Sequence, residues 1–324
     1  MALILNRPEF APANLTAFGR AVAEESDNDV LAEIFPNELI DTLTYTWVNN
    51  TLAYDEAVYR SSGAETKVGH GAGEQETVSG RLAHLGLKLL FSEDDALESV
   101  AGGTPKQAKI DDLAAQVSLA IVRKQQRMRA EALRTGKLVI NERGFVQNLD
   151  FDRDASLTTT ADVLWSDANA DPVEWAQEFV EAMGLLSDLE IDKFVVSRRV
   201  MGVLRRSAAV KAQAGVLGSM ASNEQVQSVF EENELPVPVV YAGRLNKELL
   251  LPDDSVFFAA SGAGRTLYGP VAAAANSAAR VADRRGIFVG AYEDFDSDNT
   301  WVKSDATAMP ILGMANATAA VKVV

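Results

Sequence analysis

The amino-acid sequence predicts an α+β fold. Segments with the 3.6-residue period of a helix and segments with the two-residue period of a strand are mixed along the chain, without the regular strand–helix–strand order of a parallel α/β protein. The chain has 324 residues, of which 47% are hydrophobic and 23% are charged. These are ordinary globular values, so the chain can bury a large core as one elaborate domain or as two simpler ones.

Residues 1–47 are expected to combine short helical turns with loops. They end in an extended segment, in which Leu43, Tyr45 and Trp47 alternate with threonines and so have the period of a strand. This strand leads directly into the least ordinary part of the chain.

Residues 48–90 predict a projecting arm. The segments TLAYDEAVYR (51–60) and RLAHLGLKLL (81–90) both alternate between apolar and polar residues, which predicts two long strands. A polar, glycine-rich stretch separates them. Because a two-stranded ribbon is marginally stable on its own, the arm is expected to lie on something else, such as another subunit.

Residues 106–135 have the clearest helical pattern in the chain. Pro105 precedes the segment and Gly136 follows it, as expected at the two ends of a helix. At ~1.5 Å per residue the rod would be roughly 45 Å long, well above the average for globular proteins. Its apolar stripe consists of Ile110, Leu113, Val117, Ile121 and Met128.

A hairpin with Arg143-Gly144 at its turn is expected after this helix. A second helix follows at 172–184, because Asp171 can cap it and Pro172 suits its first position. Its expected buried stripe is Trp175, Phe179 and Met183. Further strands are expected at 193–197, 237–243, 255–261, 286–292 and 317–324, and further helices at 198–207 and 223–233.

The charge and cysteine content exclude several functional classes. The chain has 30 basic and 46 acidic residues, and a net charge of −16 makes it a poor candidate for wrapping nucleic acid. It has no cysteine, which excludes disulfides, thiolate metal sites and thiol nucleophiles. No apolar run approaches the ~20 residues of a membrane span, and the start does not have the pattern of a signal peptide. We therefore expect a soluble protein made in a cytoplasm.

The stretch SGAGRTLYGP (261–270) approximates a phosphate-binding loop. Its GRT sequence imitates the end of a G-x-x-x-x-G-K-[ST] loop, but Ala259 replaces the first glycine and Arg265 replaces the lysine. We therefore predict a turn after the strand at 255–261, in which the glycines supply positive φ angles.

An acidic segment near the C-terminus approximates a calcium loop. Asp294, Asp296 and Asp298 have the spacing of its first three ligands. However, the next position is Asn299 instead of glycine, and the distal ligand position is Asp305 instead of glutamate. We predict an acidic connection between two strands, with a calcium loop as the alternative.

Catalytic signals are weak throughout the chain. The two histidines, His70 and His84, have no third ligand at a spacing that suits zinc or iron. No G-x-S-x-G nucleophile elbow is present. We therefore predict no enzyme activity, no metal and no cofactor.

A basic cluster stands out in this acidic chain. Arg198, Arg199, Arg205 and Arg206 gather on one expected helix. The cluster is interpreted as a solvated face with pairs between subunits, and contact with phosphate or an acidic partner is the alternative.

A succession of segments resembles the major capsid proteins of tailed bacteriophages, specifically the lambda-like capsid protein E family. The resemblance runs through nearly the whole chain, in order, and lies in the succession of its parts. These are EIFPNELIDTLTYTWV, EAVYRSSGAETKVG, NERGFVQNLDF, ADVLWSDANADPVEW, NKELLLPDDSVFFAAS, GRTLYGP and the C-terminal strands from 286 onward.

The resemblance implies the Hong Kong 97 type capsid fold. In that fold the arm is the E-loop, which lies across a neighbouring subunit, and the long helix is the spine of the P-domain. The implied parts are an N-arm (1–47), the E-loop with flanking strands (48–90), the P-domain with its spine helix (91–186), the A-domain (187–280) and C-terminal strands returning to the P-domain (281–324).

The function implied is that of a major capsid protein. It would assemble into pentamers and hexamers of an icosahedral head, which encloses double-stranded DNA without reading its sequence. Implied partners are a separate scaffolding protein, a portal and a decoration protein, with no membrane, and assembly would take place in the host bacterial cytoplasm. The alternatives are an encapsulin-type nanocompartment shell and, more distantly, an α+β enzyme.

The resemblance also suggests which residues contact other subunits. The A-domain helix would contribute its four arginines, Arg198, Arg199, Arg205 and Arg206. The E-loop would contribute Tyr54, Tyr59, Arg60, Lys67, His70 and Arg81.

Overall fold

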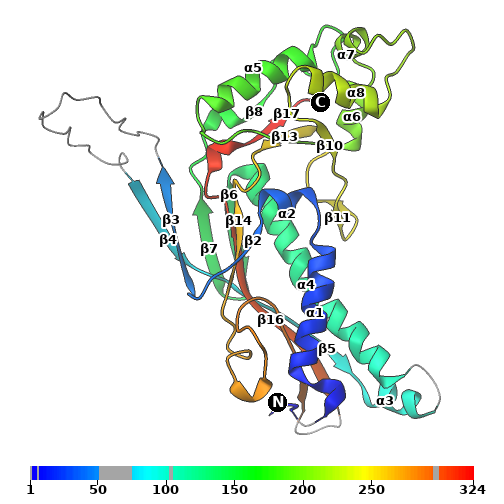
Figure 1. Ribbon diagram of the computed structural model, residues 1–324, viewed down its shortest axis with the longest axis vertical. Helices are drawn as coiled ribbons and strands as arrows, with labels where there is room; N and C mark the ends of the chain where they lie inside the picture. The colour runs from blue at the N-terminus through cyan, green and yellow to red at the C-terminus, as the bar shows by residue number, and fades with distance from the viewer. Residues whose placement is uncertain (1, 6, 51–74, 102–104, 295–298) are drawn as a thin grey trace, which may run out of the picture.

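The computed structural model describes residues 2–5, 7–50, 75–101, 105–294 and 299–324 (Figure 1). The chain forms two bodies that follow one another along the long axis, and a two-stranded ribbon leaves them sideways. The lower body is built on a six-stranded sheet and the upper body on a five-stranded sheet. Helices and mixed sheets occur in both bodies, which agrees with the predicted α+β class.

The lower sheet is organised around β16 (Thr300–Ile311), the longest strand described. Its buried residues alternate with half-buried ones from Thr300 to Asp305. β15, β14 and β5 all pair with β16 in antiparallel register. The other strands of this sheet are β1 (Ala2–Leu3), β15 (Phe288–Glu293), β14 (Arg265–Gly269), β2 (Asn37–Leu39) and β5 (His84–Phe91).

The long helix α4 (Lys106–Thr135) confirms the sequence prediction at both ends. It packs against β16 and β5, and Figure 1 shows α4 and β16 running along the same axis. The Ser304 hydroxyl donates a hydrogen bond of 2.8 Å to the Val117 carbonyl, which joins the sheet to the helix. Gly136 ends the helix with φ +66°, a left-handed conformation that favours glycine.

The N-terminal segment is more helical than expected. Residues 1–47 were predicted as short turns and loops, but α1 (Pro12–Ser26) is a 15-residue helix. It packs closely on α4 because Gly19 has no side chain: a Cβ there would lie 2.5 Å from the Ser118 hydroxyl. Small residues at the contact weaken the apolar pattern of α1, so its helical period is hard to detect in the sequence. The short helix α2 (Val30–Ile34) follows.

The upper body joins a five-stranded sheet to four helices. Its fully buried residues include Phe194, Phe230 and Phe258, and the rings of Phe194 and Phe258 stack with centroids 4.4 Å apart. The strand order is β10 (Pro238–Val240), β9 (Lys193–Val196), β13 (Ser255–Ala259), β17 (Thr318–Lys322) and β8 (Thr158–Thr160). The helices are α5 (Pro172–Gly184), α6 (Arg198–Leu204), α7 (Ala208–Gln213) and α8 (Asn223–Glu232).

Short elements complete the two bodies. The predicted hairpin is confirmed, and its turn residues Arg143 and Gly144 have φ angles of 45° and 85°. The short elements are β6 (Lys137–Glu142), β7 (Phe145–Asp150), β11 (Arg244–Leu245), β12 (Glu248–Leu249), α3 (Glu93–Val100) and the 3-10 turns at Pro8–Phe10, Ala155–Leu157, Ser277–Ala279 and Ala315–Ala317.

Within the described ranges no helix is both long and apolar enough to cross a membrane.

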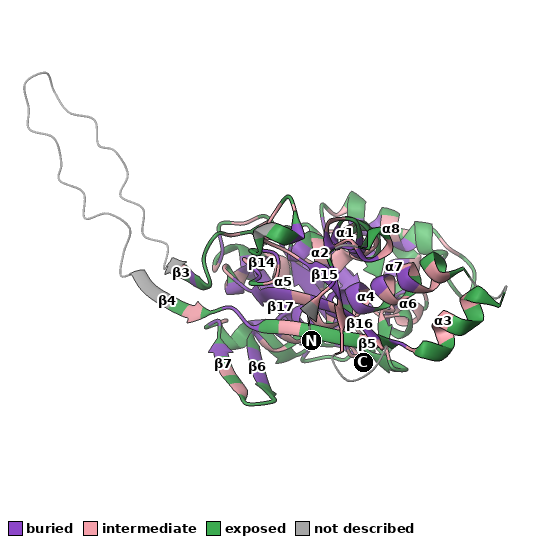
Figure 2. Cartoon of the chain, turned by 90° about the horizontal axis from the view of Figure 1, so that it is seen from below, coloured by how far each residue is buried: buried purple, intermediate pink, exposed green. Residues whose placement is uncertain are grey.

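The projecting ribbon consists of β3 (Thr44–Asn50) and β4 (Gln75–Arg81), paired antiparallel from Thr44 opposite Arg81 to Asn50 opposite Gln75. Figure 2 shows the ribbon extending away from both bodies. The prediction that residues 81–90 form the returning strand of the arm was wrong. Residues His84–Phe91 do form a strand, but it is β5, and it pairs with β16. Alternation predicts a strand without predicting its partner.

Candidate assembly surfaces

The base of the ribbon is fixed to the body by aromatic packing. Tyr45 is buried, and its ring stacks on Trp47 with centroids 5.8 Å apart. Trp47 in turn contacts Phe151 at 5.5 Å. The Tyr45 hydroxyl accepts a hydrogen bond of 2.7 Å from the Gln147 side chain. Burial raises the pKa of Tyr45 to about 12, so its hydroxyl stays protonated at neutral pH.

Gly80 of β4 provides the space that Tyr45 occupies. The two residues lie opposite each other in the ribbon. A Cβ on Gly80 would lie 2.1 Å from the Tyr45 hydroxyl oxygen and 2.4 Å from the ring. Any other residue at position 80 would therefore displace the tyrosine that fixes the ribbon to the body.

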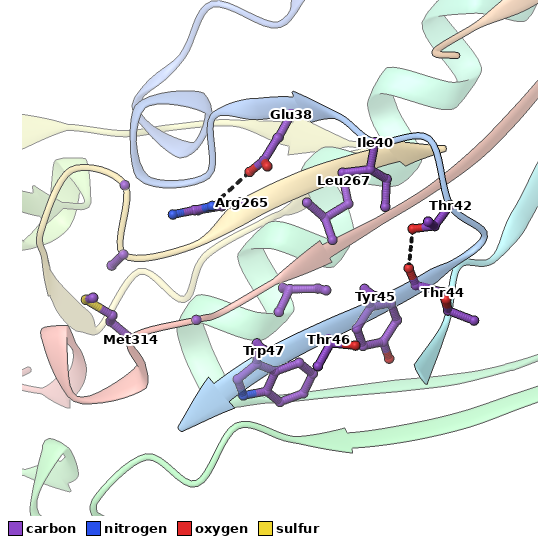
Figure 3. A pocket seen from close by; sticks show the side chains of 14 residues that line it. Glu38, Ile40, Thr42, Thr44, Tyr45, Thr46, Trp47, Arg265, Leu267 and Met314 are labelled. Atoms are coloured by element: carbon purple, nitrogen blue, oxygen red, sulfur yellow. Dashed lines mark hydrogen bonds and ion pairs between the residues drawn. The ribbon is translucent and has the colours of Figure 1, made fainter. Parts of the chain in front are cut away.

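A groove of about 570 Å³ lies beside this base (Figure 3). The residues of β3 form one wall, and β14 with the end of β2 forms the other. Arg265 and Glu38 form an ion pair of 3.0 Å on the second wall. Met314, nearly half exposed, lies at the end of the groove near Trp47. The groove thus combines threonine hydroxyls and one ion pair with apolar side chains from both walls.

The glycine-rich stretch 261–270 borders this groove but does not form a phosphate loop. Gly262 has φ +73° in the predicted turn, and Arg265–Gly269 then continues as strand β14. The amides that would hold phosphate are already used: those of Gly262, Gly264 and Thr266 donate to the carbonyls of residues 33, 34 and 36. The predicted turn is confirmed for Gly262, but Gly264 and Gly269 do not have positive φ angles; Gly264 instead leaves room for the Phe35 ring, 2.2 Å from where its Cβ would lie. The strand directly after the turn was missed.

A second groove, of about 480 Å³, is bordered by arginines. We call it the arginine groove; its charged residues are Arg198, Arg199, Arg244 and Asp253. Arg199 lies 3.5 Å from Asp253, and both are about half exposed. Three arginines thus face one aspartate, so the groove keeps a net positive charge in a chain of charge −16.

The predicted basic cluster divides into two parts. Arg198 and Arg199 begin α6 and border the arginine groove. Arg205 instead donates a hydrogen bond of 2.7 Å from Nε to the Ala221 carbonyl, so it holds the loop before α8. Arg206 is exposed at the end of the helix. Arg244 was missed, because it begins strand β11, far along the chain from the cluster.

The predicted arm residues lie almost entirely outside the described part of the chain. This holds for Tyr54, Tyr59, Arg60, Lys67 and His70. Arg81 is described: it is exposed at the end of β4, opposite Thr44.

The candidate calcium residues do not converge where they are described. Asp296 and Asp298 lie outside the described residues. Asp305 lies within β16, opposite Phe288, and pairs with Lys303 at 2.7 Å. It is therefore separated from Asp294 by the length of the β15–β16 ladder. Among described residues no group of three or more metal-ligating side chains occurs.

A buried polar cluster joins the N-terminal segment to both bodies. Arg129 of α4 is fully buried and forms hydrogen bonds of 2.6 and 2.9 Å with the two carboxylate oxygens of Asp27. Its Nε donates to the Thr266 hydroxyl at 2.8 Å. In the upper body, the Tyr241 hydroxyl donates to Asp29 at 3.2 Å. Sequence reasoning missed this cluster; an arginine within an apolar helical stripe is the signal that could have revealed it.

Comparison with known proteins identifies the family. The family model described as phage major capsid protein E matches residues 56–323. The chain belongs to this family. It is a shell protein of a phage capsid, and the resemblance found in the sequence is confirmed.

Solved structures agree with this assignment at the level of the fold. A protein described as the capsid protein of a prophage of E. coli CFT073 superposes with a TM-score of 0.67 at 16% identity, covering 100% of both chains. A phage-related protein from Bordetella bronchiseptica RB50 gives 0.60 at 10% identity, covering 99% of this chain and 97% of that one. A virus-like particle from Pyrococcus furiosus gives 0.51 at 8%, covering 94% and 98%. No curated protein matches by sequence. The predicted Hong Kong 97 type fold is confirmed.

Proposed function

We propose that this capsid protein closes its shell by assembling into pentameric and hexameric rings, with the projecting ribbon of each copy lying on a neighbouring copy. The observation that carries the proposal is the β3–β4 ribbon, which leaves the body (Figure 2) and whose base is packed through Tyr45 and Trp47. A two-stranded ribbon is marginally stable in water, so a second surface is needed to support it.

Exposed apolar side chains support contacts between copies. Val139 and Val146 lie on the β6–β7 hairpin and are 54% and 72% exposed. Leu185 and Leu217 project from the upper body and are 88% and 105% exposed. Scattered apolar side chains are common on protein surfaces, so the proposal rests on the ribbon, and these four residues are positions that a neighbouring copy could cover.

The proposed role is structural, without catalysis or a cofactor. The shell would enclose double-stranded DNA, which an acidic chain holds without tight binding. Scaffolding, portal and decoration proteins are the proposed partners, and the host bacterial cytoplasm is the proposed place of assembly. The family match favours this role over the two alternatives, a nanocompartment shell and an α+β enzyme.

Deleting residues 63–76 tests the role of the ribbon. The shortened protein should fold with an unchanged far-UV circular dichroism spectrum, because Tyr45 and Trp47 still fix the base to the body. Its assembly, followed by light scattering beside the parent protein, should be impaired. If the shortened protein assembles like the parent, the ribbon does not join neighbouring copies.

A further inference from the structure

The upper body carries a second charged surface, which is acidic. Glu174, Glu178 and Glu181 of α5 are all exposed. At 100° per residue they share one face of the helix with Leu185, which is 88% exposed. We call this face the acidic stripe; it runs for ~16 Å at 1.5 Å per residue.

The acidic stripe has no partner within the described chain. None of its three glutamates forms an ion pair there. The other side of α5 is occupied: Trp175 and Phe179 pack on the hydrophobic core, and Gln177 contacts Asn233 at 3.3 Å. The stripe is therefore a surface that the folded monomer leaves uncovered.

The stripe and the arginine groove lie on opposite sides of the upper body. The groove residues follow β9 and β10, and β10 is one edge of the five-stranded sheet. The helix α5 comes after β8, the strand at the other edge. Figure 1 shows α5 toward the β8 side of the upper body and α6 beside β10.

We propose that the arginine groove of one copy binds the acidic stripe of the next copy in a ring. This inference rests on the proposed function, and it names the surfaces that meet within the ring. Two complementary surfaces on opposite sides of one chain produce a head-to-tail contact, which closes into a ring when the rotation between copies allows it.

The two surfaces carry opposite charges, and each also has an exposed leucine. Arg198, Arg199 and Arg244 line the groove and are exposed, and Asp253 is the one carboxylate among its described lining residues, so the groove can accept further carboxylates. An apolar residue accompanies each set of charges: Leu249, 38% exposed, beside the groove and Leu185 at the end of the stripe. Exposed ion pairs add little affinity individually, but complementary charges fix which surfaces meet and in what register.

The charge of the chain favours a second copy over nucleic acid as the partner. At a net charge of −16 the protein repels phosphate at long range. The same chain offers three uncovered glutamates, which are present at equal concentration in every assembly. A neighbouring copy is therefore the acidic partner that the groove meets first.

A charge swap tests the pairing. One variant carries Glu178→Lys and Glu181→Lys, a second carries Arg198→Glu and Arg244→Glu, and a third carries all four substitutions. Each of the first two places like charges opposite each other and should reduce the assembled fraction at least about tenfold. The third restores opposite charges, with the net charge of the parent, and should recover assembly. Light scattering and negative-stain microscopy measure the result.

The matched control for the glutamate variant is Glu24→Lys with Glu25→Lys, two exposed residues of α1 whose substitution changes the net charge by the same amount. It should assemble like the parent. Folded single-surface variants that assemble normally would overturn the pairing, and so would a folded four-substitution variant that stays unassembled. If the arginine variant forms rings but loses binding to a double-stranded oligonucleotide, the groove is a nucleic-acid site and the pairing is wrong. If the parent itself forms no ring or shell, the proposed function fails together with the pairing.

Discussion

The ion pair between Arg129 and Asp27 shows how a single residue organises this fold. Both side chains are almost completely buried, at 0% and 5% exposure. Burying two charges costs free energy, and the pair is tolerated because Thr266 and Asn37 accept further hydrogen bonds from the guanidinium group. The ion pair connects the end of α1 to α4. Thr266 and Asn37 extend this connection to β14 and β2.

Asp27→Asn should therefore destabilise the protein strongly. It leaves the Arg129 guanidinium buried without a counter-ion, so the free energy of unfolding should fall by about 3 kcal/mol or more. Urea denaturation followed by circular dichroism measures the change. Glu24→Gln, an exposed substitution on the same helix, is the control and should change stability by less than about 0.5 kcal/mol. Equal effects of the two variants would contradict the account of the buried pair.

Gly80→Ala tests the close approach at the base of the ribbon. The added methyl group would lie 2.1 Å from the Tyr45 hydroxyl, so the ring must move and stability should fall by about 1–3 kcal/mol. The matched control is Gly184→Ala at the end of α5, where a Cβ meets nothing within 4 Å. Thermal unfolding should show a lower Tm for the first variant only. An unchanged Tm for Gly80→Ala would mean that Tyr45 does not fix the ribbon.

Individual elements differ in how well the sequence predicted them. The helix α4 was predicted with its observed ends, because its apolar period is long and Gly136 stops it. The strand β5 was predicted as a strand but with the wrong partner, since buried Leu82 and Ala83 turn the chain into the body. The helix α1 was missed, because Gly19 and small neighbours replace the large apolar residues that mark a helical stripe.

The candidate site was predicted less completely than the fold. Arg198 and Arg199 were named from their clustering, and both border the arginine groove. Arg244 was missed, because no local sequence pattern predicts its position. The acidic stripe was missed as well, although the i, i+4, i+7 spacing of its glutamates on the predicted helix is the signal that could have revealed it. Surfaces made from distant parts of the chain depend on how strands β9 and β10 are placed together, which composition and periodicity do not determine.

At the scale of one element, Trp175 should hold α5 on the upper sheet. Its ring stacks on Phe179 at 4.8 Å and meets Trp165 edge-on at 5.5 Å. Trp175→Ala should lower the free energy of unfolding by about 3 kcal/mol, because aromatic packing and buried area are both lost. Glu178→Ala on the exposed face of the same helix should have little effect. Identical denaturation curves for the two variants would show that α5 is not packed through Trp175.

The helix α3 should be sensitive to acid. Hydrogen bonds from Lys109, and then from Ser92, lower the pKa of Asp95 from 3.8 to about 2. Because the pKa is lower in the folded state, the carboxylate stabilises α3 above about pH 4, and this contribution is lost as the pH falls toward about 2. The Tm of Asp95→Asn should therefore fall less than that of the parent over this range. Parallel falls in Tm would contradict the assigned role of Asp95.

At the scale of the whole molecule, the fold leaves several surfaces for other copies to cover. The ribbon projects from one side (Figure 2), and the upper body carries an acidic stripe on α5 and an arginine groove after β9 and β10. These surfaces add little stability to a single copy of the chain. Their arrangement is that of a subunit whose stability and shape are completed by its neighbours.

The measurement that tests this account most directly is the mass and shape of the purified protein. Light scattering beside negative-stain electron microscopy, repeated with a co-expressed scaffolding protein, gives both. The account predicts closed shells, sheets, or rings of five and six copies. A homogeneous small oligomer that persists under both conditions would contradict it.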